Sequence, residues 1–298
     1  MISLTAERWV AGEEGIFTGL PAESYHAAPG VSHSMLKNIE PPARLPVYLT
    51  EKREVTSAMI LGTLTHSLIL EPGVPLPMLA IKPDGMKFST TEGKLWKAKA
   101  DAEKRIIIKE DEHAALHGMV KAVAEHDDCR DVFAEGDAEV SLFKLSTLDG
   151  RTCLCKARMD FIPTGNALAD IKTCMDASEE GFGKTLYDSG YFTQAAYYLD
   201  IYNAAKPADE PEKAVFVFIA VEKFPPYLVK CYTVHPLAIA DGREVNAKRL
   251  ASYMECAERK FWPGFKGGFT PIDIPGWARA RLQNAAHADW KSQLGQIV

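Results

Sequence analysis

The spacing of apolar residues changes several times along the chain, between the alternation typical of strands and the spacing typical of helices. Strand patterns cover roughly 138–146, 151–162 and 167–173, and return at 214–223 and 227–234. Helical patterns cover 110–127, roughly 177–187, 191–205 and residues 236 to about 260. Strands interleaved with helices predict an α/β fold with a mixed β-sheet that helices flank on both faces.

The remaining segments predict one domain over residues 1–298 with three elaborations. Residues 1–56 form an N-terminal extension that is expected to be irregular, apart from a short helix from Ser34. Residues 57–72 are apolar all round and end in Glu-Pro, which predicts a buried helix. Residues 82–109 form a basic, mobile and partly helical insertion, and residues 262–298 a Gly/Pro-rich, irregular tail.

Composition excludes several classes of protein. The chain has 298 residues, of which 47% are hydrophobic, so it can bury a substantial core. A net charge of −6 argues against non-specific coating of nucleic acid, but it leaves room for a local basic groove. No apolar run reaches the length of a membrane span, and the N-terminus lacks a secretory pattern. The six cysteines form no CxxC pair, so we expect reduced thiols and a cytoplasmic protein, bacterial or phage-encoded.

The stretch MDFIPTGNALADIKT, residues 159–173, reads as a β-hairpin that carries unexpected charge. A loop of two or four residues would pair Asp160 with Ala169 and mix charged and apolar side chains on both faces. A three-residue loop, 164–166, would place Asp160 opposite Asp170, and Gly or Asn there can supply the left-handed residue that such loops need. We take the three-residue register, because burial of one face specifies strand register.

In this register one face is charged and the other is apolar. The charged face would oppose Arg158, Asp160 and Ile162 to Lys172, Asp170 and Leu168, and the apolar face would oppose Ala157, Met159 and Phe161 to Thr173, Ile171 and Ala169.

Two carboxylates directly opposed across a ladder repel each other. The repulsion is relieved if one is protonated or if a cation lies between them. A hard divalent cation such as Mg²⁺ takes oxygen ligands, so Asp160, Asp170 and the carbonyl of Ile171 are candidate ligands. Lys172, on the face of Asp170, would orient a metal-bound water and help to deprotonate it. Arg158 on the same face would bind phosphate or neutralise the acids.

The residues around this hairpin resemble the PD-(D/E)XK nucleases, and specifically the RecE-type (exodeoxyribonuclease VIII) branch of phages and prophages. The matching segments occur in order: YHAAPGVSHSMLKNI (25–39), LGTLTHSLILEP (61–72), TTEGK (90–94), IIIKEDE (106–112), CKARMDFI, ADIKT and YFTQAAYYLD (191–200). One departure is Met159, which stands where the family motif usually has proline.

The resemblance implies a restriction-endonuclease-like core and further site residues. His66 of the GxxxH helix would bind the metal or order its water, and Gln194 and Tyr198 of the QxxxY helix would contact the scissile phosphate or order Lys172. Ser32 and Ser34 are candidate hydrogen-bond donors to phosphate, and Lys94 is a candidate DNA contact in the basic insertion. Glu139 is a possible further acid.

Most of these side chains also have an ordinary structural interpretation. Lys172 taken alone would be a surface lysine, and a lone histidine such as His66 is usually a core residue with one satisfied hydrogen bond. Gln194 and Tyr198 share a helix face by spacing alone. Ser34 could be a helix N-cap.

The resemblance also implies the activity and the partners. We expect a Mg²⁺-dependent exodeoxyribonuclease, with Mn²⁺ as a substitute, that degrades linear duplex DNA, in the 5′→3′ direction. It would bind DNA ends, act with a RecT-like single-strand annealing protein in recombination, and form a homo-oligomeric ring. An iron–sulfur cluster is not expected, because only Cys256 lies near the C-terminal region where related nucleases carry cysteines. The alternatives are a structure-specific endonuclease on the same core and a non-catalytic protein that binds DNA ends.

Overall fold

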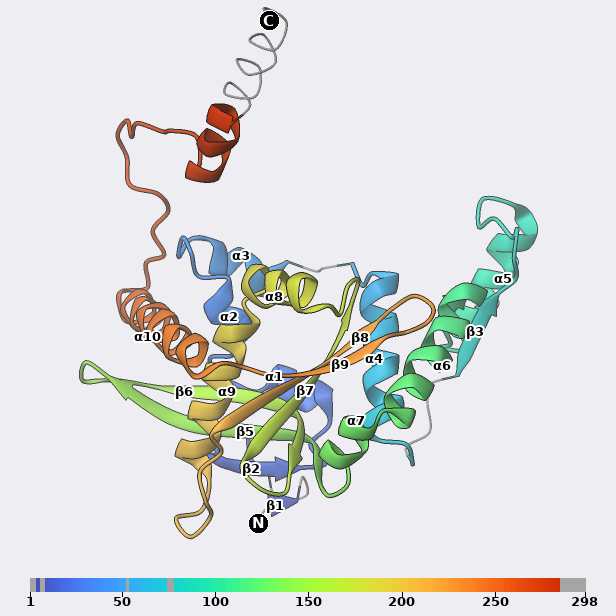
Figure 1. The fold of residues 1–298 in the computed structure, drawn as a ribbon, viewed down its shortest axis with the longest axis horizontal. Helices are drawn as coiled ribbons and strands as arrows, with labels where there is room; N and C mark the ends of the chain where they lie inside the picture. Colours follow the sequence, from blue (N-terminus) through green and yellow to red (C-terminus); the bar gives the residue numbers. More distant parts are fainter. Residues whose placement is uncertain (1–3, 6–8, 52–53, 74–77, 285–298) are drawn as a thin grey trace, which may run out of the picture. The chain divides into compact units, whose positions relative to one another are not determined.

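The central element is a seven-stranded mixed sheet with the order β1-β2-β5-β6-β7-β8-β9 (Figure 1). The structure is a computed structural model that describes residues 4–5, 9–51, 54–73 and 78–284. Its strands are β1 (Leu4–Thr5), β2 (Gly15–Thr18), β5 (Gly136–Leu148), β6 (Arg151–Pro163), β7 (Ala167–Cys174), β8 (Val215–Glu222) and β9 (Val229–Thr233). Strands β7 and β8 are parallel, and the other pairs between β2 and β9 are antiparallel.

Helices cover both faces of this sheet, as the strand and helix patterns predicted. They are α1 (Ala22–Ala27), α2 (His33–Lys37), α3 (Arg44–Thr50), α4 (Ser57–Leu70), α6 (Glu110–Glu125), α7 (Asp127–Val132), α8 (Glu179–Asp188), α9 (Tyr191–Ala205) and α10 (Pro236–Arg259). Helix α9 packs on one face with the aromatic and aliphatic residues of β8, while α4 and α6 pack on the opposite face. Helix α10 lies against α9 (Figure 1), where a Cβ on Gly242 would come within 2.7 Å of the carbonyl oxygen of Phe192.

The β5–β6 hairpin closes at a two-residue turn. Asp149 and Gly150 both have positive φ, 50° and 75°, which is the backbone of a type I′ turn between Leu148 and Arg151. The ladder then runs in one register to Gly136 and Pro163 at the far end.

The predicted register of the next hairpin is confirmed. Strand β6 ends at Pro163 and β7 begins at Ala167, so the loop is residues 164–166, and Phe161 pairs with Ala169. This is the one β6–β7 pair in the described ladder. On the side away from the loop, the backbone N–H of Ile171 donates to the carboxylate of Asp160 at 2.9 Å and not to the backbone of β6. The strands therefore separate at the acids.

The predicted division into a charged and an apolar face is wrong for Ala157 and Met159. Both lie in the apolar cluster on the α9 side, whereas Phe161 lies with Ala169 and Ile171 in the cluster on the α4 side. The reason is Glu139, which has φ +53° and interrupts the β5–β6 ladder opposite Asp160. A left-handed residue changes the alternation of side chains in β5, and β6 changes faces opposite it, between Met159 and Phe161.

Several segments are more regular than expected. The described part of residues 1–56 contains β2, α1, α2 and α3, and the helix expected from Ser34 begins at His33. Helix α7 was not predicted. The basic insertion contains α5 (Thr91–Ala102) and β4 (Ile106–Lys109), and β4 pairs in parallel with β3 (Leu79–Lys82). Helix α4 is buried along one side only, and its first turn is exposed.

The chain divides into two units, residues 1–264 and 265–298. In the second, residues 276–284 are helical, where an irregular tail was expected, and residues 285–298 of that prediction lie outside the described residues. None of the helices in the described part of the chain is long and apolar enough to span a membrane.

A buried lysine anchors the N-terminal extension to the sheet. Lys156 on β6 is 6% exposed, and its Nζ donates to the carbonyl oxygens of Tyr25, His26 and Ala28 at 3.0, 3.2 and 2.6 Å. Burial lowers the pKa of this ammonium. The three carbonyl acceptors replace the hydrogen bonds to water that the ammonium loses on burial.

We predict that Lys156→Met lowers the free energy of unfolding by about 3 kcal/mol, because three buried carbonyls lose a charged donor. Chemical denaturation measures this change. Lys121→Met, at a surface position in α6, is the matched control and should change the stability by less than about 0.5 kcal/mol. Equal effects of the two substitutions would contradict the anchoring role.

Candidate active site

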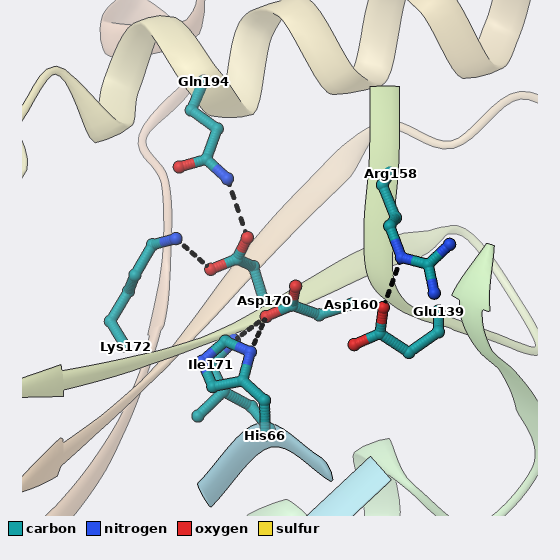
Figure 2. Close-up of polar contacts among 8 residues, drawn as sticks. All are labelled: His66, Glu139, Arg158, Asp160, Asp170, Ile171, Lys172 and Gln194. Atoms are coloured by element: carbon teal, nitrogen blue, oxygen red, sulfur yellow. Dashed lines mark hydrogen bonds and ion pairs between the residues drawn. The ribbon is translucent and has the colours of Figure 1, made fainter. Parts of the chain in front are cut away.

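Strand β7 presents Asp170 and Lys172 next to the point where β6 carries Asp160 (Figure 2). Asp170 is 2% exposed, and its Oδ2 lies 2.5 Å from the Nζ of Lys172. Asp160 accepts the N–H of Ile171. In a strand the N–H and C=O of one residue point to the same side, so the Ile171 carbonyl also points towards the gap between β6 and β7.

Two helices reach the acids from opposite faces of the sheet, as Figure 2 shows. His66 of α4 approaches from one side and places its Nδ1 3.2 Å from Oδ2 of Asp160. Gln194 of α9 approaches from the other side, and its Nε2 donates to Oδ1 of Asp170 at 2.8 Å. Gln194 therefore orients the carboxylate of Asp170. The expectation was that it would order Lys172 or contact the scissile phosphate.

A third carboxylate lies beside Asp160. His66, Glu139 and Asp160 each offer a ligand atom within 4.8 Å of the other two. Glu139 also accepts a hydrogen bond from Nε of Arg158 at 2.5 Å, and Nη1 of Arg158 donates to the carbonyl of Leu20 and to Ser141. Arg158 thus neutralises an acid and fixes the surrounding backbone, which is one of the two roles expected for it.

Burial and like charge together make Asp160 a weak acid for an aspartate. Burial first, and then the charge of Asp170, raise the pKa of Asp160 to about 6, against the opposing effects of His66, Lys172 and the Ile171 N–H. The carboxylate of Asp160 is therefore poised to take up a cation or a proton near neutral pH.

Lys172 carries its proton in this environment. Burial lowers the pKa of Lys172, but the charges of Asp170 and Asp160 outweigh it and raise the pKa above the ordinary value. The ammonium also lies 4.7 Å from the ring centroid of Tyr191, a cation–π distance. With both acids charged, Lys172 acts as a cation and a hydrogen-bond donor.

A cavity of about 660 Å³ opens beside Asp160. Ser32, Ser34 and Tyr198 line it. Burial first, and then charge from Tyr25 and the two aspartates, raise the pKa of Tyr198 well above its usual range, so its hydroxyl stays protonated.

One expectation is corrected here, and a second, the contact of Lys94 with DNA, stays a prediction. Ser32, not Ser34, is the N-cap of α2, because its Oγ accepts the N–H of Met35. Lys94 is exposed on α5, beyond α6 from the central sheet (Figure 1), so the structure does not bring it to the acids.

The donors present fit a hard divalent cation. Three carboxylates, of Asp160, Asp170 and Glu139, face two permanent cations, Lys172 and Arg158. Oδ2 of Asp170 is buried and forms an ion pair with Lys172. Among the described residues it accepts no hydrogen bond besides this ion pair. Carboxylate and carbonyl oxygens with one imidazole suit Mg²⁺ or Mn²⁺.

Sequence reasoning missed Tyr191 and understated Glu139. Tyr191 precedes Gln194 by three residues, so it shares a helix face with it, and this spacing was the available signal. The approach of Glu139 to Asp160 depends on a left-handed backbone that glutamate rarely adopts, and nothing in the residue pattern indicates it.

Comparison with known proteins supports this fold. A crystal structure from Eubacterium rectale, described as a "Putative exonuclease", has a TM-score of 0.57 and 14% identity, over 86% of this chain and 97% of that chain. The crystal structure of SSO0001 has a TM-score of 0.30 and 13% identity, over 73% of this chain and 84% of that chain. No curated protein matches the chain.

The predicted restriction-endonuclease-like α/β fold is confirmed, and the family match with its structural neighbour supports a nuclease. Residues 32–269 match the family described as "PDDEXK-like domain of unknown function (DUF3799)", and all five of Asp160, Asp170, Lys172, His66 and Gln194 lie inside this range. The chain belongs to this family of PDDEXK-like domains.

Proposed function

We propose that the protein is a Mg²⁺-dependent exodeoxyribonuclease that degrades linear double-stranded DNA in the 5′→3′ direction. The observation that carries the proposal is the convergence of Asp160, Asp170 and Lys172 at the split between β6 and β7, in a chain of the PDDEXK-like family. The cavity beside Asp160 supports it as a place for a DNA strand.

The reaction is hydrolysis of a phosphodiester: water attacks phosphorus, the P–O3′ bond breaks, and the products carry a 3′ hydroxyl and a 5′ phosphate. Asp160, Asp170 and the Ile171 carbonyl would hold the cation, with His66 and Glu139 beside Asp160. A divalent cation at this position would stabilise negative charge on the phosphate and lower the pKa of water.

The protein's own groups have distinct roles in this proposal. His66 and Gln194 position the two aspartates. Lys172 donates its Nζ–H to a phosphate oxygen or to the attacking water, and it can accept a proton only once the charge of the acids is compensated. Tyr191 holds the ammonium in place.

The decisive experiment is digestion of linear duplex DNA, labelled at the 5′ or the 3′ end, with Mg²⁺. We expect Asp170→Asn and Lys172→Ala to lose activity by about 10²–10⁴-fold, the usual contribution of a positioned catalytic group. Gln194→Leu should lose less, because it acts through Asp170. Lys184→Ala, an exposed lysine on α8, is the matched control and should retain full activity.

The substrates in this experiment separate the competing functions. Closed-circular duplex should resist digestion, and release of label should follow the 5′ end. Cleavage of circles would favour a structure-specific endonuclease. Equal activity of the wild type, Asp170→Asn and Lys172→Ala would refute the site, and binding of DNA ends without hydrolysis would favour a non-catalytic role.

We predict that stability and metal binding depend on pH through Asp160. Its pKa in the folded metal-free protein is raised to about 6, so its charge disfavours folding and stability falls as the pH rises through 6. A bound cation favours the charged form, so Mn²⁺ should raise the melting temperature more at pH 7.5 than at pH 5. Affinity should fall by up to about tenfold per pH unit below 6.

Thermal unfolding with Mn²⁺ or with a chelator measures both effects. Asp160→Asn should be at least as stable as the wild type in chelator at pH 7.5, because the buried charge is gone while an oxygen still accepts the Ile171 N–H. It should also lose most of the Mn²⁺-induced shift. A shift in Asp160→Asn as large as in the wild type would remove Asp160 from the metal site.

The resemblance to RecE-type nucleases extends the proposal to assembly and partners. We propose a homo-oligomeric ring on DNA ends that acts with a RecT-like single-strand annealing protein. Light scattering on the full chain should give a mass that is a small multiple of 32.8 kDa. A monomeric mass at micromolar concentration, with and without duplex DNA, would contradict the ring.

A further inference from the structure

A second group of ligand-type side chains lies away from the proposed active site. His126, Cys129 and Cys231 each offer a ligand atom within 4.8 Å of the other two. The distance between the two Sγ atoms is 3.6 Å. All six cysteines, including this pair, are free thiols.

The fold assembles this group from two distant parts of the chain. His126 lies at the junction between α6 and α7, and Cys129 follows one helical turn later, so both face one side of the turn. Cys231 comes from β9, an edge strand of the described sheet. The two cysteines are 102 residues apart in sequence, which is why no spacing motif marks the group.

Packing of two buried thiols does not explain why a ring nitrogen of His126 is buried without a partner. Nδ1 of His126 is buried, and the described residues provide it with no hydrogen-bond partner. A buried polar atom of this kind usually has a partner, and where the protein supplies none an ion or water is the usual explanation. This second observation therefore points to a ligand on the histidine that accompanies the two sulfurs.

We propose that His126, Cys129 and Cys231 bind a zinc ion. Thiolate sulfur and imidazole nitrogen are the donors that zinc prefers. Two sulfurs bound tetrahedrally at ~2.3 Å from zinc stand about 3.8 Å apart, close to the observed 3.6 Å. A disulfide would require about 2.0 Å.

The charges around the site are compatible with this ion. Two thiolates and a neutral imidazole balance the charge of Zn²⁺, and each thiol releases its proton to solvent as its bond to zinc forms. Water would complete the four ligands.

Zinc at this position would tie the helix layer to the edge of the sheet. In the described structure β9 pairs with β8 alone, and Cys231 lies in the middle of it. Zinc bound by Cys231 of β9 and Cys129 of α7 would connect this edge strand to the helix. The strand would then have a second attachment besides its backbone pairing with β8. The expected role is structural and independent of the hydrolytic reaction.

The test is titration of the reduced, full-length protein with Co²⁺, which replaces zinc and reports sulfur ligands by a thiolate-to-cobalt charge-transfer band. We expect this band to saturate at one thiolate-bound cobalt per chain and to disappear when Zn²⁺ is added. Cys129→Ser and Cys231→Ser should abolish the band, and His126→Asn should weaken binding at least tenfold. Zinc removal should lower the melting temperature and speed amide exchange in β9.

Two matched controls make the result specific. Cys153→Ser removes a half-buried thiol outside the group and should leave the band unchanged. Asp160→Asn removes the other candidate metal site, which has no sulfur, and should also leave the band unchanged.

The proposal is overturned if the folded, reduced wild type gives no charge-transfer band, or if Cys231→Ser binds cobalt with the same spectrum. It is also overturned if mass spectrometry finds a Cys129–Cys231 disulfide and the reduced protein takes no metal. Should Cys129→Ser fail to fold, the wild-type titration and Cys231→Ser decide the question. Failure of this site would leave the proposed nuclease function untouched.

Discussion

The interruption of the sheet at Glu139 and Asp160 is the constraint on which the rest of the site depends. Glu139 has a left-handed backbone, which costs a residue of this type about 1–2 kcal/mol. The ladder between β5 and β6 is broken at this one position. Strands β6 and β7 pair at Phe161 and Ala169 and separate at the next position away from the loop, where the two aspartates lie. The carboxylate of Asp160 then takes the place of a backbone acceptor for Ile171. A continuous ladder would bury this backbone edge and leave no room for a cation.

The same interruption explains how one site draws side chains from both faces of the sheet. His66 belongs to a helix on one face and Gln194 to a helix on the other, yet they contact acids that lie within the same gap. Each acid has its own positioning partner, so neither depends on the other for its orientation. The cost is a concentration of negative charge that raises the pKa of Asp160, and the site trades stability for the capacity to hold a cation.

The pattern of residues predicts a large part of this arrangement, and the limit of prediction is physical. Loop length and apolar alternation were enough to predict the three-residue loop and the pairing of Phe161 with Ala169, because both are local properties. The faces of Ala157 and Met159 were mispredicted, because the reversal depends on a backbone conformation that glutamate disfavours in isolation. Gln194 was indicated by the resemblance to the QxxxY motif, but its contact with Asp170 arises from tertiary packing.

The two candidate metal sites lie under the same helix layer, and donor chemistry would keep their ions apart. Helix α4 supplies His66 to a group of carboxylates, and the α6–α7 junction supplies His126 to a pair of thiols. A hard cation gains little from thiols, because sulfur is a soft ligand, whereas zinc binds sulfur strongly. A chain with both sites could therefore hold zinc in its scaffold and still exchange magnesium at its reaction centre. Each group contains one histidine, so the oxygen ligands of one group and the sulfur ligands of the other decide which metal ion each site prefers.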